Sequence, residues 1–232
     1  MAKFLPGPTV GRISGRIGAS IFSHNKGGPY IRNGTKPTIS TTEYAQAAKS
    51  RLAGLSASWE DESAADRLAW KVWAETNPIT DRLGQSINLT GHQAYISLNA
   101  RLLASSLSAI SAPPVDADPP PLYTLTVAVD IGPGDTEIVF TPSPIGASDH
   151  VVVRACVLDS PAIHHVSNML RLVGTSAAEQ ESPLDIESML TGRFGSLAVG
   201  QVVVVQVHVL RATTGLVSPP LRAQTTVVDT TV

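Results

Sequence analysis

The chain has 232 residues, of which 43% are hydrophobic and 16% are charged, and its formal net charge is −2. This composition excludes bulk disorder, which requires low hydrophobicity and high net charge. The length accommodates one large domain or two small ones. Charge is unevenly distributed, because residues 1–36 contain six lysines and arginines and no acidic residue, whereas the remainder holds a formal charge of −8. This asymmetry indicates that the N-terminal region binds an acidic partner surface.

Residues 1–41 are rich in glycine, proline, serine and threonine and predict an extended basic arm. Lys26-Gly27-Gly28-Pro29 is typical of a turn, and the flanking segments Ser20–Ser23 and Pro29–Arg32 predict the limbs of a hairpin. An isolated hairpin is marginally stable in water, so we expect this region to be loose until it binds a partner. The residues expected to contact that partner are Arg12, Arg16, Ile21, Phe22, Lys26, Tyr30, Ile31 and Arg32.

Residues 42–110 predict a helical docking segment with three short helices. The first begins after Thr42 and ends near residues 54–58. The second begins after Trp59, where three acidic residues favour a helix N-terminus, and ends at Asn77-Pro78. The third runs from about Gly91 to Ser105. Helical spacing predicts these inward side chains: Tyr44, Ala47, Ala48, Leu52, Leu55, Ala65, Leu68, Ala69, Val72, Trp73, Tyr95, Leu98, Leu102 and Leu103.

Residues 111–121 contain five prolines, which predict a semi-rigid polyproline linker. Beyond it the sequence is typical of β-structure, with six strands expected at Leu122–Val129, Thr136–Phe140, His150–Leu158, Asn168–Val173, Gln201–Arg211 and Arg222–Val228. A helical turn is expected within Pro183–Leu190. The fold class is therefore α+β, with an antiparallel β-sandwich at residues 122–232.

The chemistry-bearing residues do not predict an enzyme. No nucleotide-binding loop or nucleophile-elbow motif is present, and the single cysteine, Cys156, lies in an apolar run that predicts a buried thiol. Two groups invite a metal hypothesis: the histidines His150, His164, His165 and His208, and the carboxylates Asp185 and Glu187. Adjacent histidines on a strand point to opposite faces, and the carboxylates lack a third ligand. We expect no metal and no cofactor.

Alternatives to a protein-binding arm are a nucleic-acid site and a flexible tail. Arginines interleaved with Phe22 and Tyr30 could bind phosphates and stack on bases, but six charges over 36 residues are few and the remaining chain is acidic. We therefore do not expect a nucleic-acid partner. The three tryptophans could form a sugar-stacking platform, although their helical spacing favours core packing. Neither a secretory signal nor a membrane-spanning helix is predicted, so we expect synthesis in a bacterial-type cytoplasm.

Specific segments resemble a group of uncharacterised tailed-phage and prophage proteins. They are GRIGASIFSHNKGGPYIRNGTKP at residues 15–37, LSASW at residues 55–59, and the tryptophan-rich stretch 64–73, within a resemblance that covers residues 15–103. Residues 122–232 resemble immunoglobulin-like and fibronectin type III-like sandwiches in pattern, without a Cys-Trp-Cys triad. These resemblances imply a virion component, associated with the capsid, neck or tail, that binds other virion proteins and copies of itself.

The function expected from the sequence is thus structural. The arm and helices would dock into the virion, and the sandwich would be displayed outward. The competing hypothesis is an adhesion module in which the sandwich recognises a host glycan or surface protein. Fold alone does not decide between the two.

Overall fold

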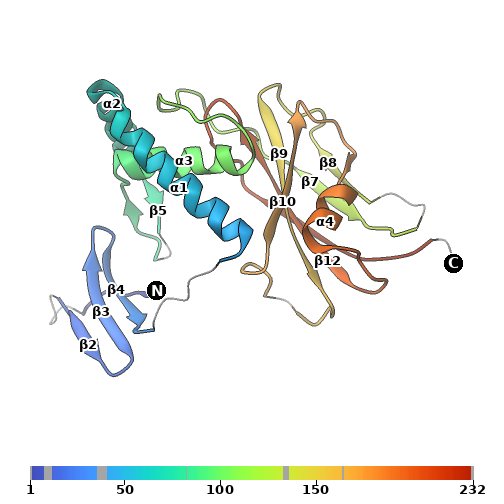
Figure 1. The fold of residues 1–232 in the computed structure, drawn as a ribbon, viewed down its shortest axis with the longest axis horizontal. Coiled ribbons are helices and arrows are strands. Elements are labelled where there is room, and N and C mark those ends of the chain that lie inside the picture. Colours follow the sequence, from blue (N-terminus) through green and yellow to red (C-terminus); the bar gives the residue numbers. More distant parts are fainter. Residues whose placement is uncertain are drawn as a thin grey trace. The chain divides into compact units, whose positions relative to one another are not determined.

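A computed structural model describes residues 2–7, 12–35, 41–81, 83–132, 136–163 and 165–230 (Figure 1). The chain forms two compact units, residues 1–96 and 97–232. The division falls within helix α3 (Gly91–Ala104), upstream of the proline-rich segment at which the sequence places a boundary.

The N-terminal region is a four-stranded antiparallel sheet, which corrects the expectation of an extended arm. Its strands are β1 (Ala2–Lys3), β2 (Gly15–Ile17), β3 (Ser20–Asn25) and β4 (Gly28–Asn33), in the spatial order β1-β4-β3-β2 (Figure 1). The predicted hairpin is confirmed as β3 and β4. Gly18 and Gly28 adopt φ values of 58° and 99°, a region that L side chains disfavour. The glycines therefore make tight turns rather than a loose arm.

The helical part of the first unit contains α1 (Glu43–Asp61), α2 (Ala64–Thr76) and the start of α3, together with a small hairpin of β5 (Ile79–Thr80) and β6 (Ser86–Ile87). The expected end of the first helix and start of the second were wrong, because α1 continues through Trp59. The Ser63 hydroxyl accepts a hydrogen bond from the Asp66 amide and so begins α2. Thr90 and Gln93 exchange two hydrogen bonds in a capping box before α3.

The core of this unit is aromatic. The rings of Trp59 and Trp70 contact Tyr95, at centroid distances of 5.3 Å and 5.5 Å. Trp70 is fully buried and also contacts Trp73. These contacts confirm that the tryptophans pack against helices. The predicted inward faces of α1 and α2 were partly wrong, because four of their large apolar side chains are exposed: Tyr44, Leu52, Leu68 and Val72.

The second unit contains two antiparallel sheets. One has the order β11-β8-β7 and comprises β7 (Thr124–Ala128), β8 (Glu137–Thr141) and β11 (Leu184–Asp185). The other has the order β10-β9-β12-β13 and comprises β9 (Asp149–Leu158), β10 (Arg171–Ala178), β12 (Val202–Arg211) and β13 (Leu221–Thr226). All six predicted strands are present with shifted ends, and the expected helical turn is α4 (Glu187–Phe194).

Both sheets contribute to one apolar core. Phe140 from β8 and Val153 and Val205 from the larger sheet are at most 1% exposed and belong to the same cluster. Alternate residues of β9 and β12 point into this cluster, as the pleat requires. Cys156 points the other way, where it is 2% exposed in a smaller apolar cluster.

The proline-rich segment lies within the second unit. The Asn99 side chain receives a hydrogen bond from the Ile110 amide and donates one to the Ile110 carbonyl. The Ala117 carbonyl accepts a hydrogen bond from Arg211, and Pro119 is buried. The segment expected to act as a spacer is thereby attached through Ala117 to β12, and the Asn99 bonds fix the chain just before it. Within the described parts of the chain, no helix has the length and apolarity needed to cross a bilayer.

Candidate protein-interaction surface

The register of the N-terminal sheet divides the predicted contact residues between two faces. Arg16 pairs with Ile21, and Ile21 pairs with Arg32, so these three side chains share one face. Tyr30 pairs with Lys3 and lies on the same face two residues from Arg32. Phe22 and Ile31 pair with each other on the opposite face. The structure therefore brings together four predicted residues on a cationic face and two on an apolar face.

The remaining two predicted residues lie outside the strands. Lys26 occupies the two-residue turn between β3 and β4, where the Asn25 side chain accepts a hydrogen bond from the Gly27 amide. Arg12 precedes β2 and is exposed. Lysine and arginine therefore extend from the cationic face to one end of the sheet.

The apolar face is only partly covered. Phe4 and Phe22 pack edge to face at a centroid distance of 5.9 Å, and Ile31 lies across from Phe22. Ile17 on β2 is 71% exposed. Among the described residues of β1 to β4, no side chain is buried. An antiparallel sheet normally covers one face with a core, so this sheet has apolar area left for a partner.

β2 forms an edge of the sheet, and its backbone is available on one side. All three of its residues are exposed. Arg16 donates a hydrogen bond from its side chain to the Gly18 carbonyl, and no described strand pairs with the outer edge of β2. An edge strand with exposed N–H and C=O groups is a template for adding another strand.

An ion pair holds the opposite edge of the sheet. The Lys3 ammonium lies 2.6 Å from the Asp81 carboxylate, whose side chain is 4% exposed. Asp81 also accepts hydrogen bonds from the Leu83 and Gln85 amides. The Lys3 hydrogen bond is the largest cause of a lowered pKa of Asp81. Strand β1 is thus connected to the β5–β6 hairpin, a contact that the sequence pattern did not suggest.

Two adjoining hollows lie on the first unit beside Lys26. One, of about 550 Å³, is lined by Trp59, Arg67 and Lys71, and the other, of about 670 Å³, is lined by Lys3 and Gln93. Lys26, Asn88 and Leu89 line both. Among their lining residues the only carboxylate is Glu75. Cations from the sheet and the helices therefore border the same depression, which sequence spacing could not reveal.

The histidines and carboxylates considered as metal ligands have other positions. His150 is hydrogen-bonded through Nδ1 to the Ser176 carbonyl, and Asp185 accepts a hydrogen bond from the Glu187 amide at the start of α4. His165 is exposed, while His164 lies outside the described residues. Within the described ranges, no group of three histidine, cysteine or acidic residues could hold a metal.

Comparison with protein-family models, curated proteins and solved structures finds no match to this chain.

Proposed function

We propose that this chain is a non-enzymatic structural component of a phage-like virion, associated with the capsid, neck or tail. It docks through its N-terminal sheet and helices, and it displays the second unit as a β-sandwich of immunoglobulin-like or fibronectin type III-like kind. Its partners are other virion proteins and copies of itself. The observation that carries the proposal is an N-terminal sheet whose described residues include no buried side chain.

The open edge of that sheet supports docking by strand addition. β2 offers three exposed residues in a row, and Ile17 supplies apolar area beside an exposed backbone. The cationic face, with Arg16 and Arg32, suits an acidic partner. Residues 37–232 of another copy carry a formal charge of −8 and are one such surface.

The helices support a second contact area. Tyr44 and Leu52 on α1 are 59% and 48% exposed, and Leu68 and Val72 on α2 are 60% and 52% exposed. Large apolar side chains concentrated on two helices are typical of a protein-protein contact. In the second unit, a core shared by a four-stranded and a three-stranded antiparallel sheet is compatible with a sandwich.

The test uses particles purified from cells that make the full-length chain. Ile17→Lys should remove the apolar contribution of the edge strand without altering a buried site, because Ile17 is 71% exposed. Val115→Lys is the matched control, since Val115 is 99% exposed and lies in the second unit. We expect mass spectrometry of the particles to detect the wild type and the Val115 variant, and to detect far less of the Ile17 variant. Equal incorporation of all three would reject docking through β2, and absence of the wild type would reject a virion role.

A further inference from the structure

A second feature lies on the larger sheet of the second unit, on the face turned away from the shared core. Two apolar clusters occupy this face, one around Cys156 and Val204 and the other around Leu102 and Leu210. Between them lies a polar band that begins with Arg154. Arg154 on β9 is directly opposite Gln206 on β12, and His208 follows two residues along β12. Arg154 and His208 are therefore diagonal neighbours on the same face.

The polar band borders a cavity of about 210 Å³. Arg101 from α3 joins Arg154 and His208 in its lining, and Ser105, Gln206 and Ser218 add hydroxyl and amide groups. No aspartate or glutamate is among the lining residues. The cavity is smaller than the pockets that hold drug-sized ligands, and it suits a single small ion.

The two arginines of this cavity are poorly compensated by negative charge. Among the described residues, the side chains of Arg154 and His208 form no hydrogen bond and no ion pair. Arg101 donates only a long hydrogen bond of 3.4 Å to the Gly215 carbonyl. On β13, Arg222 lies in register with Gln206 and donates a hydrogen bond to its side chain. Asp118, which does not line the cavity, attracts Arg101 more weakly than Arg154 repels it.

The two arginines repel each other and disfavour the protonated form of His208. Burial, followed by repulsion from Arg154 and Arg101, lowers the pKa of His208 to about 4. Burial and then repulsion from Arg154 also lower the pKa of Arg101. Arg101 and Arg154 are exposed, so water screens part of their repulsion, and an anion bound between them would remove more of it.

We propose that this cavity binds a tetrahedral oxyanion, a phosphate group, through Arg101, Arg154 and His208. The planar guanidinium groups can each donate two hydrogen bonds to phosphate oxygens, and the Ser105 and Ser218 hydroxyls line the same cavity. The group is either free phosphate or the phosphate of an ester, because the chemistry that recognises the two is the same.

The test is NMR titration of the full-length protein, following the His208 ring resonance. The probes are inorganic phosphate and glycerol phosphate at pH 7, each compared with sodium chloride at equal ionic strength. We expect saturable shifts with at least one phosphate compound and none with chloride. Tighter binding of inorganic phosphate would indicate the free ion, and tighter binding of glycerol phosphate would indicate an ester. Shifts no larger than those caused by chloride would overturn the proposal.

Variants separate a specific site from general attraction to cations. Arg154→Gln should weaken phosphate binding by about tenfold or more, because one charged, two-pronged donor is removed. Arg171→Gln on β10 is the matched control, since Arg171 is exposed and does not line the cavity. Equal weakening by both would overturn the site. If Arg154→Gln does not fold, Arg154→Lys retains the charge and should still weaken binding through loss of the fork geometry.

Sulfate provides the pH measurement, because it does not titrate near neutrality. Bound sulfate should favour protonation of His208, so sulfate affinity should rise as pH falls from 7 to 5, and His208→Gln should abolish that rise. The charged groups facing His208 are Arg154 on β9 and Arg101 on α3. A rise that persists in His208→Gln would overturn the role of His208.

Discussion

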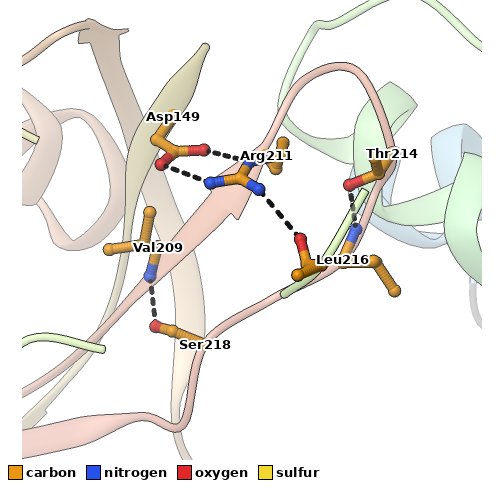
Figure 2. Close-up of polar contacts among 7 residues, drawn as sticks. Asp149, Val209, Arg211, Thr214, Leu216 and Ser218 are labelled. Carbon is orange, nitrogen blue, oxygen red and sulfur yellow. Dashed lines mark hydrogen bonds and ion pairs between the residues drawn. The ribbon is translucent and has the colours of Figure 1, made fainter. Parts of the chain in front are cut away.

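Arg211 lies directly across from Asp149 in the register of β12 and β9 and binds both of its carboxylate oxygens (Figure 2). The two distances, from Nε and from an Nη atom, are 2.9 Å and 3.2 Å. The Asp149 side chain is 2% exposed. The hydrogen bond that Arg211 donates to Asp149 raises the pKa of Arg211. This pair closes the end of the larger sheet, where Ser218 also accepts a hydrogen bond from the Val209 amide.

Removing the carboxylate should destabilise the second unit. Arg211 would lose its charged partner in a largely desolvated position, so Asp149→Ala should lower the free energy of unfolding of that unit by about 3 to 5 kcal/mol. Circular dichroism in denaturant measures the change. Glu181→Ala, at an exposed residue, is the control and should change stability by less than about 0.5 kcal/mol. A loss no greater than that of the control would contradict the role of the pair.

The three tryptophans lie in the first unit, so their fluorescence reports on that unit alone. Gly91→Ala should shift the fluorescence transition, because a Cβ at Gly91 would lie 2.9 Å from the Lys71 amide nitrogen and 3.1 Å from the Trp70 carbonyl carbon. Forcing the backbones of α2 and α3 apart should cost about 1 to 3 kcal/mol.

Gly54 provides the opposite case on α1. A Cβ there meets nothing within 4 Å, so Gly54→Ala should stabilise the helix by about 0.5 to 1 kcal/mol. Opposite shifts of the two fluorescence midpoints are expected. Two shifts of the same sign would mean that the α2–α3 approach is looser than described.

His208 should make stability depend on pH. Its pKa is about 4 in the folded chain and has a reference value of 6.5, so the unfolded state takes up the proton first. Stability is therefore unaffected above pH 6.5, and it falls as the pH decreases from 6.5 to about 4. The loss is at most about 3 kcal/mol, at 1.36 kcal/mol per pKa unit. Denaturant unfolding in chloride buffers should show this loss in wild type, and His208→Gln should lack it.

In the Lys3–Asp81 pair the charged form of the titrating group is the stabilising one, whereas for His208 it is the destabilising one. Because the folded-state pKa of Asp81 is lowered, its contribution is present above the unfolded pKa and is lost as the pH falls through the folded value. Lys3→Met should raise the pKa of Asp81 toward its ordinary range, since the largest cause of the shift is removed. Carboxyl NMR titration measures this. An unchanged titration would show that the Leu83 and Gln85 amides alone account for the lowered pKa.

Sequence patterns identified the second unit better than the first. Strand β12 is buried on both faces over its first four residues, and the sequence shows this as a continuous run of valines. By contrast, β1 and β2 have two and three residues, which is too short for periodicity to appear. The acidic residues 60–62 lie at the end of α1, and α2 begins only after the Ser63 cap, so the acidic run did not mark a helix start. Short strands such as β1 and β2 therefore form through pairing with other strands, which a local sequence pattern does not show.

The candidate surfaces show the same limit. Arg16, Ile21 and Arg32 could be identified as contact residues by composition, but only the register places them on one face. Arg101, Arg154 and His208 come from three distant segments and share no motif. Their proximity depends on the pairing of β9 with β12 and on the position of α3. Neither is encoded in spacing along the chain.

The second unit should require the C-terminal half of α3. Leu102 is fully buried against Val152 and Leu210, and Leu107 and Ile110 pack on the same cluster. A fragment that starts at residue 122, the beginning of the expected sandwich, lacks these α3 and loop side chains. Val152 and Leu210 would then be exposed to solvent. Loss of the Leu102 side chain alone should cost about 2 to 5 kcal/mol. We therefore expect fragment 97–232 to unfold cooperatively at a higher denaturant concentration than fragment 122–232. Equal midpoints by circular dichroism would mean that α3 contributes nothing to the second unit and that the proline-rich segment is the true boundary.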